Sequence, residues 1–280
     1  MNSSNIVDGK IVKIISNLYT VSASGVNYDC RARGKFRKDG ITPLVGDLVT
    51  IDKNDKYILE IKERKNYLDR PLIANIDAAV IVTSVKKPDL SLNLLDKLLT
   101  IVIHKRIEPI IVLTKIDLLN KKEKKELKTI TKYYNSIGIK VIDNKRLNKL
   151  TKLIKNKTVV LTGQTGAGKS TLLNKLDCSL NLATGEISEA LGRGKHTTRH
   201  VELFNYKSSL IADTPGFSAL DINNMSNEEI RDSFIEFNVD CQFKDCSHLN
   251  EKGCKVVELV NDNKILRSRY ENYLKFRRQK

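Results

Sequence analysis

The sequence predicts a three-domain chain: an oligonucleotide-binding (OB-fold) β-barrel over residues 1–68, an α/β domain over residues 69–221, and a mostly helical domain over residues 222–280. Short segments rich in Val, Ile, Tyr and Thr, separated by turn signals, fill the first part and are typical of a small barrel. Apolar strands then alternate with helical patterns, which indicates a parallel sheet covered on both faces. Helical patterns dominate the last part, which also contains a cluster of cysteines.

Five strands are expected in the barrel, at residues 10–15, 18–23, 26–37, 47–52 and 57–62. From position 31 onward the third strand carries a basic residue at every second position, namely Arg31, Arg33, Lys35 and Arg37. Successive side chains of a strand point to opposite faces, so all four basic side chains are expected on one face. Such a row fits a phosphate track for RNA binding, and a merely solvated strand face is the alternative interpretation.

The α/β domain is predicted from alternating strands and helices. The expected strands are residues 78–83, 109–114, 140–142 and 159–161, and the expected helices are residues 91–105, 121–136 and 147–155. Ser91 is a candidate N-cap for the first of these helices. Beyond residue 221, the capping-box pattern at Ser226 predicts a helix that runs to about Phe237. An amphipathic pattern predicts a last helix with Leu266, Tyr270, Tyr273 and Leu274 on one face.

The composition favours a soluble protein that binds a polyanion. The formal net charge is +16, and 40% of the residues are hydrophobic, enough for a sizeable core. A nucleic acid or an anionic surface would balance this charge, although a lysine-rich genome is an alternative explanation. The N-terminal residues show no signal-peptide pattern, and no apolar run approaches the ~20 residues that span a bilayer. We expect a cytoplasmic monomer without membrane contacts.

A phosphate-binding loop is the strongest single motif. Residues 163–170, GQTGAGKS, match G-x-x-x-x-G-K-[ST] between an apolar strand and a helical segment. The glycines let backbone N–H groups surround phosphate oxygens, and the helix N-terminus adds its positive dipole end. Lys169 is expected on the β- and γ-phosphates and Ser170 on Mg²⁺. The nucleotide-binding residues expected here are Gly163, Gln164, Thr165, Gly166, Ala167, Gly168, Lys169, Ser170 and Thr171.

The nucleotide base is expected to be guanine. Thr114-Lys115-Ile116-Asp117 follows the predicted strand at residues 109–114, at the strand end where open α/β sheets bind ligands. The Asp117 carboxylate can accept hydrogen bonds from guanine N1–H and the 2-amino group, whereas adenine offers neither donor. The stem of Lys115 can cover the base. The motif, whose first residue is Thr114, therefore predicts GTP or GDP as the ligand.

A third motif, IADTPGF at residues 211–217, follows another predicted strand. Asp213 can hold Mg²⁺ through a water molecule, and the backbone N–H of Gly216 can sense the γ-phosphate. Both residues are therefore expected in the nucleotide site, close to the phosphate loop.

Residues 192–200, GRGKHTTRH, form a polar and basic segment with glycines, which makes it a candidate switch loop. Thr198, in preference to Thr197, is expected to complete the Mg²⁺ shell. His196 is the candidate for positioning the attacking water, with a surface histidine or an RNA contact as the alternative. Lys169, Thr198 and His196 are thus the predicted catalytic residues.

Three cysteines and a histidine lie within fourteen residues: Cys241, Cys246, His248 and Cys254. Thiolate and imidazole ligands suit zinc, and four protein ligands without an open position indicate a structural site. Cytosolic cysteines seldom form disulfides, which also favours a metal. Buried free cysteines are the alternative, and Cys30 and Cys178 are expected to be ordinary packed thiols.

The nucleotide motifs occur in an inverted order. The base-reading motif precedes the phosphate loop, whereas in an ordinary GTPase it comes last. Moving residues 72–157 to the end of the chain restores the usual order, and a fold can survive such a permutation when its old termini lie close together. In the permuted order the motif at residues 211–217 leads directly into the helical domain, which suggests that a nucleotide-driven shift there is passed to that domain.

This order, together with the flanking barrel and the cysteine cluster, resembles the circularly permuted, small-ribosomal-subunit-dependent GTPases of the RsgA type. The resemblance covers nearly the whole chain and rests on RPLIANIDAAVIVTS, SLNLLDKLL, PIIVLTKIDLL, GQTGAGKSTLLN, GKHTTRH, DTPGF and the C-x₄-C-x-H-x₅-C spacing. It implies a GTP hydrolase that binds the rRNA of the immature small ribosomal subunit and leaves after hydrolysis stimulated by that subunit. It also implies one structural zinc ion, and Mg²⁺ bound with GTP.

The sequence departs from the family pattern in three places. Thr114 stands where asparagine is usual, so a weaker link to the phosphate loop is expected, and no Ser-Ala pair backs the base near residues 141–145. Lys252 replaces the usual proline of the cysteine cluster. Phe217, a hydrophobic residue as in the family, stands where Ras-like enzymes place a water-orienting glutamine, so intrinsic hydrolysis should be slow.

Two other functions are consistent with parts of the pattern. A nucleotide-gated RNA-binding regulator, in which hydrolysis is incidental, would need the same nucleotide motifs and basic surfaces. A phosphate-loop kinase for a small metabolite is a third possibility, but the base-reading motif and the cysteine cluster argue against it.

Overall fold

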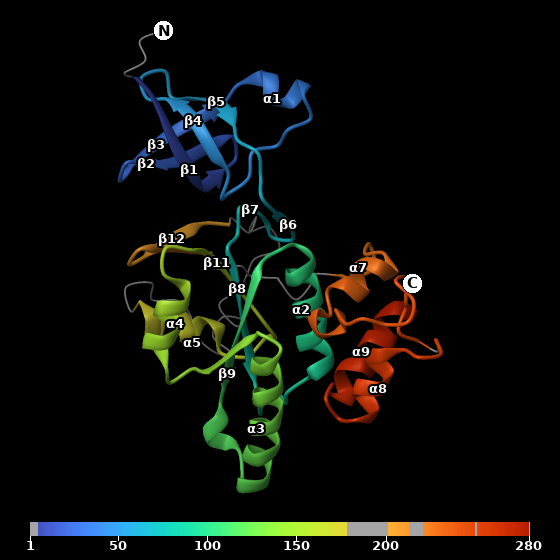
Figure 1. Ribbon diagram of the computed structural model, residues 1–280. Helices are drawn as coiled ribbons and strands as arrows, with labels where there is room; N and C mark the ends of the chain where they lie inside the picture. Colours follow the sequence, from blue (N-terminus) through green and yellow to red (C-terminus); the bar gives the residue numbers. More distant parts are fainter. Residues whose placement is uncertain (1–4, 178–200, 213–220, 250, 280) are drawn as a thin grey trace.

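The computed structural model describes residues 5–177, 201–212, 221–249 and 251–279. The N-terminal barrel stands at one end of a central six-stranded sheet, and the C-terminal helices lie along one side of it (Figure 1). Within the described ranges, no helix is both long and apolar enough to cross a membrane.

The barrel closes as the sequence predicts. Its strands are β1 (Ile6–Ile15), β2 (Leu18–Ala23), β3 (Val26–Ala32), β4 (Leu48–Asp52) and β5 (Tyr57–Ile61), joined in the order β1-β2-β3-β5-β4. Inward-facing residues such as Ile11, Val21 and Val49 are fully buried in a core that belongs to the barrel alone. This alternation of buried and exposed positions is what a sheet with one solvated face requires.

The prediction of a single strand over residues 26–37 is wrong in its second half. β3 ends at Ala32, and Gly34–Lys38 form the short helix α1. Phe36 on this helix is 7% exposed and packs into the barrel core, so burial of its ring takes the chain out of the sheet. The four basic residues therefore do not share a strand face: β3 carries Arg31, the connection carries Arg33, and α1 carries Lys35 and Arg37.

The central sheet has the strand order β10-β9-β8-β11-β13-β12. Its strands are β8 (Ala78–Ser84), β9 (Glu108–Thr114), β10 (Lys140–Asp143), β11 (Thr158–Thr162), β12 (Leu203–Tyr206) and β13 (Ser209–Ala212). Neighbouring strands are parallel except for the antiparallel edge pair of β12 and β13. β8 and β11 are buried along their whole lengths, in keeping with their continuous apolar sequences. The edge strand β12 and the short hairpin of β6 (Tyr67–Asp69) and β7 (Leu72–Ala74) are not predicted by the sequence pattern.

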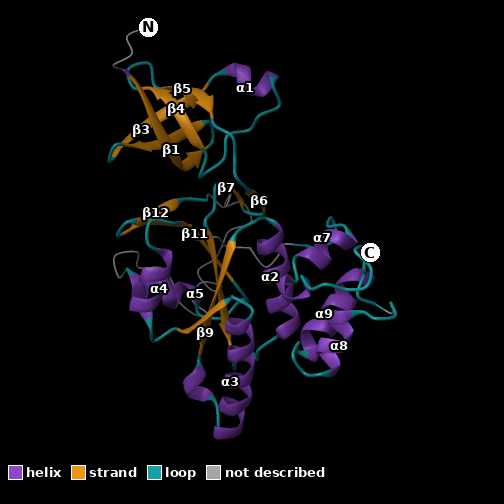
Figure 2. Ribbon diagram, in the orientation of Figure 1, coloured by secondary structure: helices purple, strands orange, loops and turns teal. Residues whose placement is uncertain are grey.

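Helices cover both faces of the sheet (Figure 2). α2 (Leu92–His104) begins after Ser91, whose hydroxyl accepts a hydrogen bond from the backbone N–H of Leu94, which confirms the predicted N-cap. α3 (Lys121–Ser136) has the predicted bounds and begins with a capping box of Asn120 and Glu123. α4 (Leu147–Ile154) and α5 (Lys169–Leu176) pack on the opposite face from α2 and α3.

The C-terminal region shares a hydrophobic core with the sheet. It contains α7 (Asn227–Asp232), a 3₁₀ turn (Ile235–Phe237), α8 (Lys255–Asn261) and α9 (Arg267–Arg278). One cluster of buried side chains, including Leu99, Tyr134, Ile230 and Phe276, continues from α2 and α3 to α7 and α9. The predicted capping box at Ser226 is present, but the helix ends at Asp232 instead of Phe237. The chain turns there so that two phenylalanines, with ring centroids 5.0 Å apart, reach the core.

Polar contacts join the barrel to the sheet. Lys10 Nζ donates to Thr158 Oγ1 at 2.7 Å, and Lys13 Nζ lies 2.9 Å from a carboxylate oxygen of Glu202, beside an isolated backbone bridge between the same two residues. The side chains of Lys13 and Glu202 are each 34% exposed. Buried contacts add to these polar ones: the backbone N–H of Ala74 donates to the carbonyl oxygen of Val45 at 2.8 Å, and the Val45 side chain, 2% exposed, packs in the core cluster that includes residues of the sheet.

Candidate nucleotide site and metal centre

Two nucleotide motifs lie at the same edge of the central sheet. Thr114-Lys115-Ile116-Asp117 begins at the last residue of β9, and the phosphate loop follows β11 directly. β8 lies between these strands and pairs with both in parallel. The chain places β9 and β10 on one side of β8 and β11 on the other, so this edge is a topological switch point. Open α/β sheets bind ligands at such points.

The phosphate loop depends on a close approach of two backbones. Gly163 has a φ of 134°, and a Cβ at this position would lie 2.0 Å from the carbonyl oxygen of Val82 on β8. Only glycine fits there unless the strand moves. The loop leads into the N-terminus of α5, whose unpaired N–H groups favour anions. Lys169 Nζ lies inside the loop, where it donates to the carbonyl oxygens of Gly163 at 2.8 Å and Gln164 at 3.0 Å.

Hydrogen bonds tie the base-reading motif to the phosphate loop. The buried hydroxyl of Thr114 donates to the carbonyl oxygen of Ala167 at 2.7 Å, across 53 positions of sequence. Lys115 Nζ donates to the carbonyl oxygen of Gly166 at 2.9 Å. The link from this motif to the phosphate loop was expected to be weaker because threonine replaces the usual asparagine at position 114. The Thr114 hydroxyl nevertheless forms a link to that loop. The two motifs, inverted along the chain, form parts of one site.

Asp117 lies at the open side of this site. Lys115 has a left-handed φ of 60°, which directs the chain into a 3₁₀ turn over Ile116–Leu118 with the Asp117 side chain exposed. Lys115 Nζ also donates to the carbonyl oxygen of Lys87, in the loop between β8 and α2. This lysine therefore bridges three loops, and the exposed carboxylate beside them can accept hydrogen bonds from a ligand.

The remaining predicted residues of the nucleotide site, His196, Thr198, Asp213 and Gly216, lie outside the described residues. The flanking strands are described: β13 ends at Ala212 and runs parallel to β11. The motif at residues 211–217 therefore starts at the same edge of the sheet as the phosphate loop.

The four predicted metal ligands come together in space. The ligand atoms of Cys241, Cys246, His248 and Cys254 lie within 4.8 Å of one another. His248 Nδ1 is 3.6 Å from Cys241 Sγ and 3.5 Å from Cys254 Sγ. Tetrahedral zinc with its usual Zn–S and Zn–N bond lengths would place such atoms about 3.6 Å apart. The cluster can therefore hold a metal ion with little rearrangement.

Burial controls protonation within this cluster. It raises the pKa of the Cys246 thiol to about 12, raises the pKa of the Cys254 thiol, and lowers the pKa of the His248 imidazole. The buried ligands thus favour their neutral forms in the absence of a cation. A divalent cation reverses this preference for the thiols, because it stabilises thiolates directly.

Glu251 and α9 support the loop that carries His248. The Glu251 carboxylate accepts hydrogen bonds from the backbone N–H groups of Ser247 and Leu249, both at 2.8 Å. Burial acts against ionisation, but the hydrogen bonds from the Ser247 hydroxyl and these backbone groups dominate and lower the pKa of Glu251 to about 2. The Tyr270 hydroxyl of α9 donates to the carbonyl oxygen of His248 at 2.8 Å. No sequence motif indicated the role of Glu251.

Two of the basic residues assigned to RNA binding line a cavity. The cavity has a volume of about 970 Å³ and is bordered by barrel residues, by Leu72 of β7 and by Val201. Arg31 and Arg33 lie on its wall and are exposed, and Lys35 is exposed on α1. These three basic residues are therefore accessible from solvent, although they do not form a single row.

A buried ionic network between α2 and α9 is not indicated by any motif. Asp96 and Arg269 are fully buried and form an ion pair at 2.9 Å. Asp96 is the one acidic residue of the apolar segment SLNLLDKLLTIVIHK, and this was the one sequence feature that could have indicated a buried ion pair. Arg269 belongs to a run of basic residues near the C-terminus, in the segment predicted to form an amphipathic helix.

Comparison with known proteins decides the family. The family model described as RsgA GTPase matches residues 61–223, and the one described as RsgA N-terminal domain matches residues 8–57. The chain belongs to the RsgA GTPase family. The topology agrees with a circular permutation, because β8, β9 and β10 with the base-reading motif precede β11, β12 and β13 with the phosphate loop.

RsgA-family relatives align with nearly the whole chain. "Small ribosomal subunit biogenesis GTPase RsgA 2" of Oceanobacillus iheyensis is 46% identical, with 96% of each chain covered. "Small ribosomal subunit biogenesis GTPase RsgA" of Enterococcus faecalis is 47% identical over 96% of this chain and 93% of the relative.

Solved structures support the same RsgA-type fold. The structure of YloQ, described as a circularly permuted GTPase, matches with a TM-score of 0.85 and 36% identity, covering 99% of this chain and 96% of YloQ. YjeQ from Thermotoga maritima matches with a TM-score of 0.85 and 30% identity, covering 98% of both chains.

Proposed function

We propose that this chain is a GTP hydrolase that acts in the biogenesis of the small ribosomal subunit, binds its rRNA, and leaves after hydrolysis that the subunit stimulates. The observation that carries the proposal is the pair of hydrogen bonds from Thr114 and Lys115 to the phosphate loop. They join a guanine-reading motif to a phosphate-binding motif in one site. Membership in the RsgA GTPase family supports it, because relatives aligned over nearly the whole chain are named for this role.

GTP recognition is assigned to two corners of the site. At one corner, Asp117 accepts hydrogen bonds from guanine, and the stem of Lys115 covers the base. At the other, backbone N–H groups of residues 163–169 surround the phosphates, and Lys169 exchanges its carbonyl partners for phosphate oxygens. The full nucleotide-binding set is Thr114, Lys115, Asp117, residues 163–171, Asp213 and Gly216.

Hydrolysis is assigned to Lys169, Thr198 and His196. Lys169 stabilises negative charge that develops on the transferred phosphoryl group. His196 orients and polarises the attacking water, a role that a hydrophobic residue at position 217 cannot fill. Mg²⁺ held by Ser170 and Thr198, and by Asp213 through water, would neutralise charge on the β- and γ-phosphates.

One structural zinc ion is assigned to Cys241, Cys246, His248 and Cys254. The short distances between the four ligand atoms support this assignment, as does the number of protein ligands, since structural zinc sites use four. The metal would hold the loop between α7 and α8 in one conformation, and no part in hydrolysis is assigned to it.

The rRNA contacts are assigned to the basic residues Arg31, Arg33, Lys35 and Arg37, with the charge of +16 as the general attraction. Residues 1–68, 69–221 and 222–280 are the proposed functional units. The chain is proposed to act as a cytoplasmic monomer.

A turnover assay with purified ribosomal subunits tests the proposal. GTP hydrolysis should rise when small subunits are titrated in and stay unchanged with large subunits. His196→Ala should lower the stimulated kcat by roughly 10²-fold, within the range for loss of acid–base assistance, while GDP affinity stays unchanged. ATP in place of GTP serves as the specificity control.

Two outcomes would contradict the proposal. Stimulation by large subunits alone would overturn the partner. GTP binding and small-subunit binding without stimulated turnover would favour the alternative, a nucleotide-gated RNA-binding regulator.

A further inference from the structure

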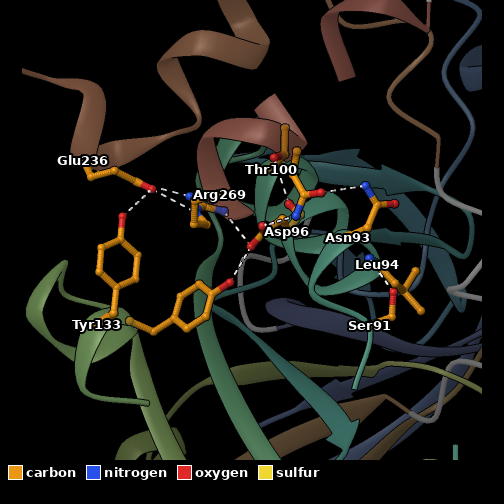
Figure 3. A network of polar contacts seen from close by, with 10 residues as sticks. Ser91, Asn93, Leu94, Asp96, Thr100, Tyr133, Glu236 and Arg269 are labelled. Atoms are coloured by element: carbon orange, nitrogen blue, oxygen red, sulfur yellow. Dashed lines mark hydrogen bonds and ion pairs between the residues drawn. The ribbon is translucent and has the colours of Figure 1, made fainter. Parts of the chain in front are cut away.

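A charged network is buried where the C-terminal helix meets α2 and α3 (Figure 3). Arg269 of α9 donates through Nη1 to Asp96 of α2 at 2.9 Å and through Nε to Glu236 at 2.7 Å. The side chains of Arg269 and Asp96 are 0% exposed, and that of Glu236 is 4% exposed. Two carboxylates from separate elements therefore share one guanidinium.

Neutral donors complete the network. The Tyr134 hydroxyl of α3 donates to Asp96 at 2.6 Å, and Asn272 Nδ2 of α9 donates to the other Asp96 oxygen at 2.6 Å. The Tyr133 hydroxyl donates to Glu236 at 3.1 Å. The Arg269 guanidinium also lies 4.2 Å from the ring centroid of Phe234. Every charged group thus has directed partners, as a buried ion pair requires.

On one side, the network reaches the loops of the nucleotide site. α3, which carries both tyrosines, starts at Asn120, three residues after Asp117. In its first turn, Glu123 accepts a hydrogen bond from Lys86 at 2.7 Å, and Lys86 lies in the loop that leads from β8 to α2. Lys115 connects this same loop to the phosphate loop. The starts of α2 and α3 are therefore tied together beside the nucleotide motifs.

On the other side, α9 reaches the metal-ligand cluster. One turn beyond Arg269, the Tyr273 hydroxyl donates to the carbonyl oxygen of Ser247, and Arg277 Nη1 donates to the same oxygen at 2.8 Å. The Tyr270 hydroxyl binds the neighbouring carbonyl of His248. α9 thus lies between the cluster of metal ligands and the network.

We propose that Asp96, Arg269 and Glu236 form a coupling element: they make docking of α9 on α2 and α3 depend on whether guanine nucleotide holds the loops at the starts of those helices. The inference rests on the proposed nucleotide site at Asp117 and the phosphate loop. Through this element, nucleotide binding would affect the C-terminal region independently of the motif at residues 211–217.

The chemistry of the network makes the coupling two-state. A partly separated network would leave buried charges without partners, so α9 is either docked with all contacts made or released into water. Nucleotide that orders the loops before α2 and α3 places Asp96 and Tyr134 in the docked geometry and therefore favours that state. By linkage, docking of α9 must increase nucleotide affinity by the same factor.

Backbone hydrogen exchange of α9 in the full chain, with and without GDP, tests this inference. GDP should slow exchange in α9 of the wild type by about fivefold or more, the lower end of typical coupling. The effect should be lost in Arg269→Met. It should be reduced in Tyr134→Phe, which removes one hydrogen bond and leaves the ion pair in place, so the test survives if Arg269→Met does not fold.

Lys255→Met is the matched control, because it removes an exposed ion pair on α8 and should keep the full effect of GDP. The inference is wrong if wild type binds GDP without any change in α9 exchange, or if both network variants respond to GDP as wild type does. Failure of the wild type to bind GDP at all would instead refute the proposed nucleotide site.

Discussion

The barrel and the C-terminal helices flank the same sheet, but they are attached to it in different ways. The barrel keeps a core of its own and meets the sheet domain through half-buried polar pairs such as Lys13 and Glu202 and through the buried side chain of Val45. The C-terminal helices share one hydrophobic core with α2 and α3 and add the fully buried pair of Asp96 and Arg269. Fewer buried side chains therefore fix the barrel than fix the C-terminal helices, which form one core with the nucleotide domain.

The largest effect is expected for Arg269→Met, which tests how firmly the C-terminal helices are held. The substitution leaves Asp96 and Glu236 buried without their cation, which should lower the free energy of unfolding by about 3–5 kcal/mol. Urea denaturation of the purified chain measures the loss. Lys255→Met, on an exposed pair of α8, should change the free energy of unfolding far less, because water solvates both partners of the pair. Similar losses in both variants would mean that the shared hydrophobic core alone holds the C-terminal helices.

Loss of the metal should affect one flanking region and spare the other. Cys254→Ser removes a metal ligand, and we expect a loss of about 2 kcal/mol, or roughly 4–8 °C in Tm, as the loop between α7 and α8 loosens. Elemental analysis should show less than one zinc ion per chain, and hydrogen exchange should change in α7–α9 but not in the barrel. Cys30 lies in the barrel core, away from the candidate metal ligands, so Cys30→Ser should retain one zinc ion per chain. A full zinc content in Cys254→Ser would refute the ligand assignment.

The nucleotide loops are linked to each other by a buried neutral hydrogen bond. Thr114→Val removes the donor to the Ala167 carbonyl at nearly constant volume and should weaken GDP binding by about tenfold, close to the value of one hydrogen bond. Isothermal titration calorimetry measures the affinity. Thr100→Val is the control, since the Thr100 hydroxyl is buried but bonds only to the backbone of its own helix. Unchanged GDP affinity in Thr114→Val would show that the link between the loops is dispensable.

The smallest effect is expected where the barrel meets the sheet. Lys13→Met should lower the free energy of unfolding by at most about 1 kcal/mol, because both partners are partly hydrated. The difference from wild type should vanish in 1 M salt, where the Debye length is about 3 Å. Lys62→Met, in a barrel-internal pair with Asp8, provides the comparison. A loss as large as that of Arg269→Met would show that the barrel is fixed as firmly as the C-terminal helices.

Local patterns were sufficient for much of the fold. The starts of α2 and α3 follow from Ser91 and Asn120, which cap them with their own side chains. The phosphate loop follows from the spacing of its glycines, lysine and serine within residues 163–170. These features depend on a few neighbouring residues, and neighbouring residues are what a sequence displays.

Other features could not be predicted from local patterns. The segment RARGKFRK alternates like a strand, but burial of Phe36 in the barrel core makes its second half a helix. Glu251 resembles an ordinary surface acid until its hydrogen bonds to two backbone N–H groups of the metal-ligand loop are seen. In both cases the conformation or role of the residue depends on groups that it contacts in space, and these groups are brought into position only by folding.

The sequence by itself determined the inverted order of the nucleotide motifs, the set of candidate metal ligands and the cationic character of the chain, because each depends on residue types or their spacing along the chain. Only the tertiary structure decided that Asp96 and Arg269, 173 positions apart, form a buried pair instead of two solvated surface charges. Burial is a property of the assembled core. A charge is stable there only when folding brings its partners within bonding distance, and a local sequence pattern does not show which distant residues will become partners.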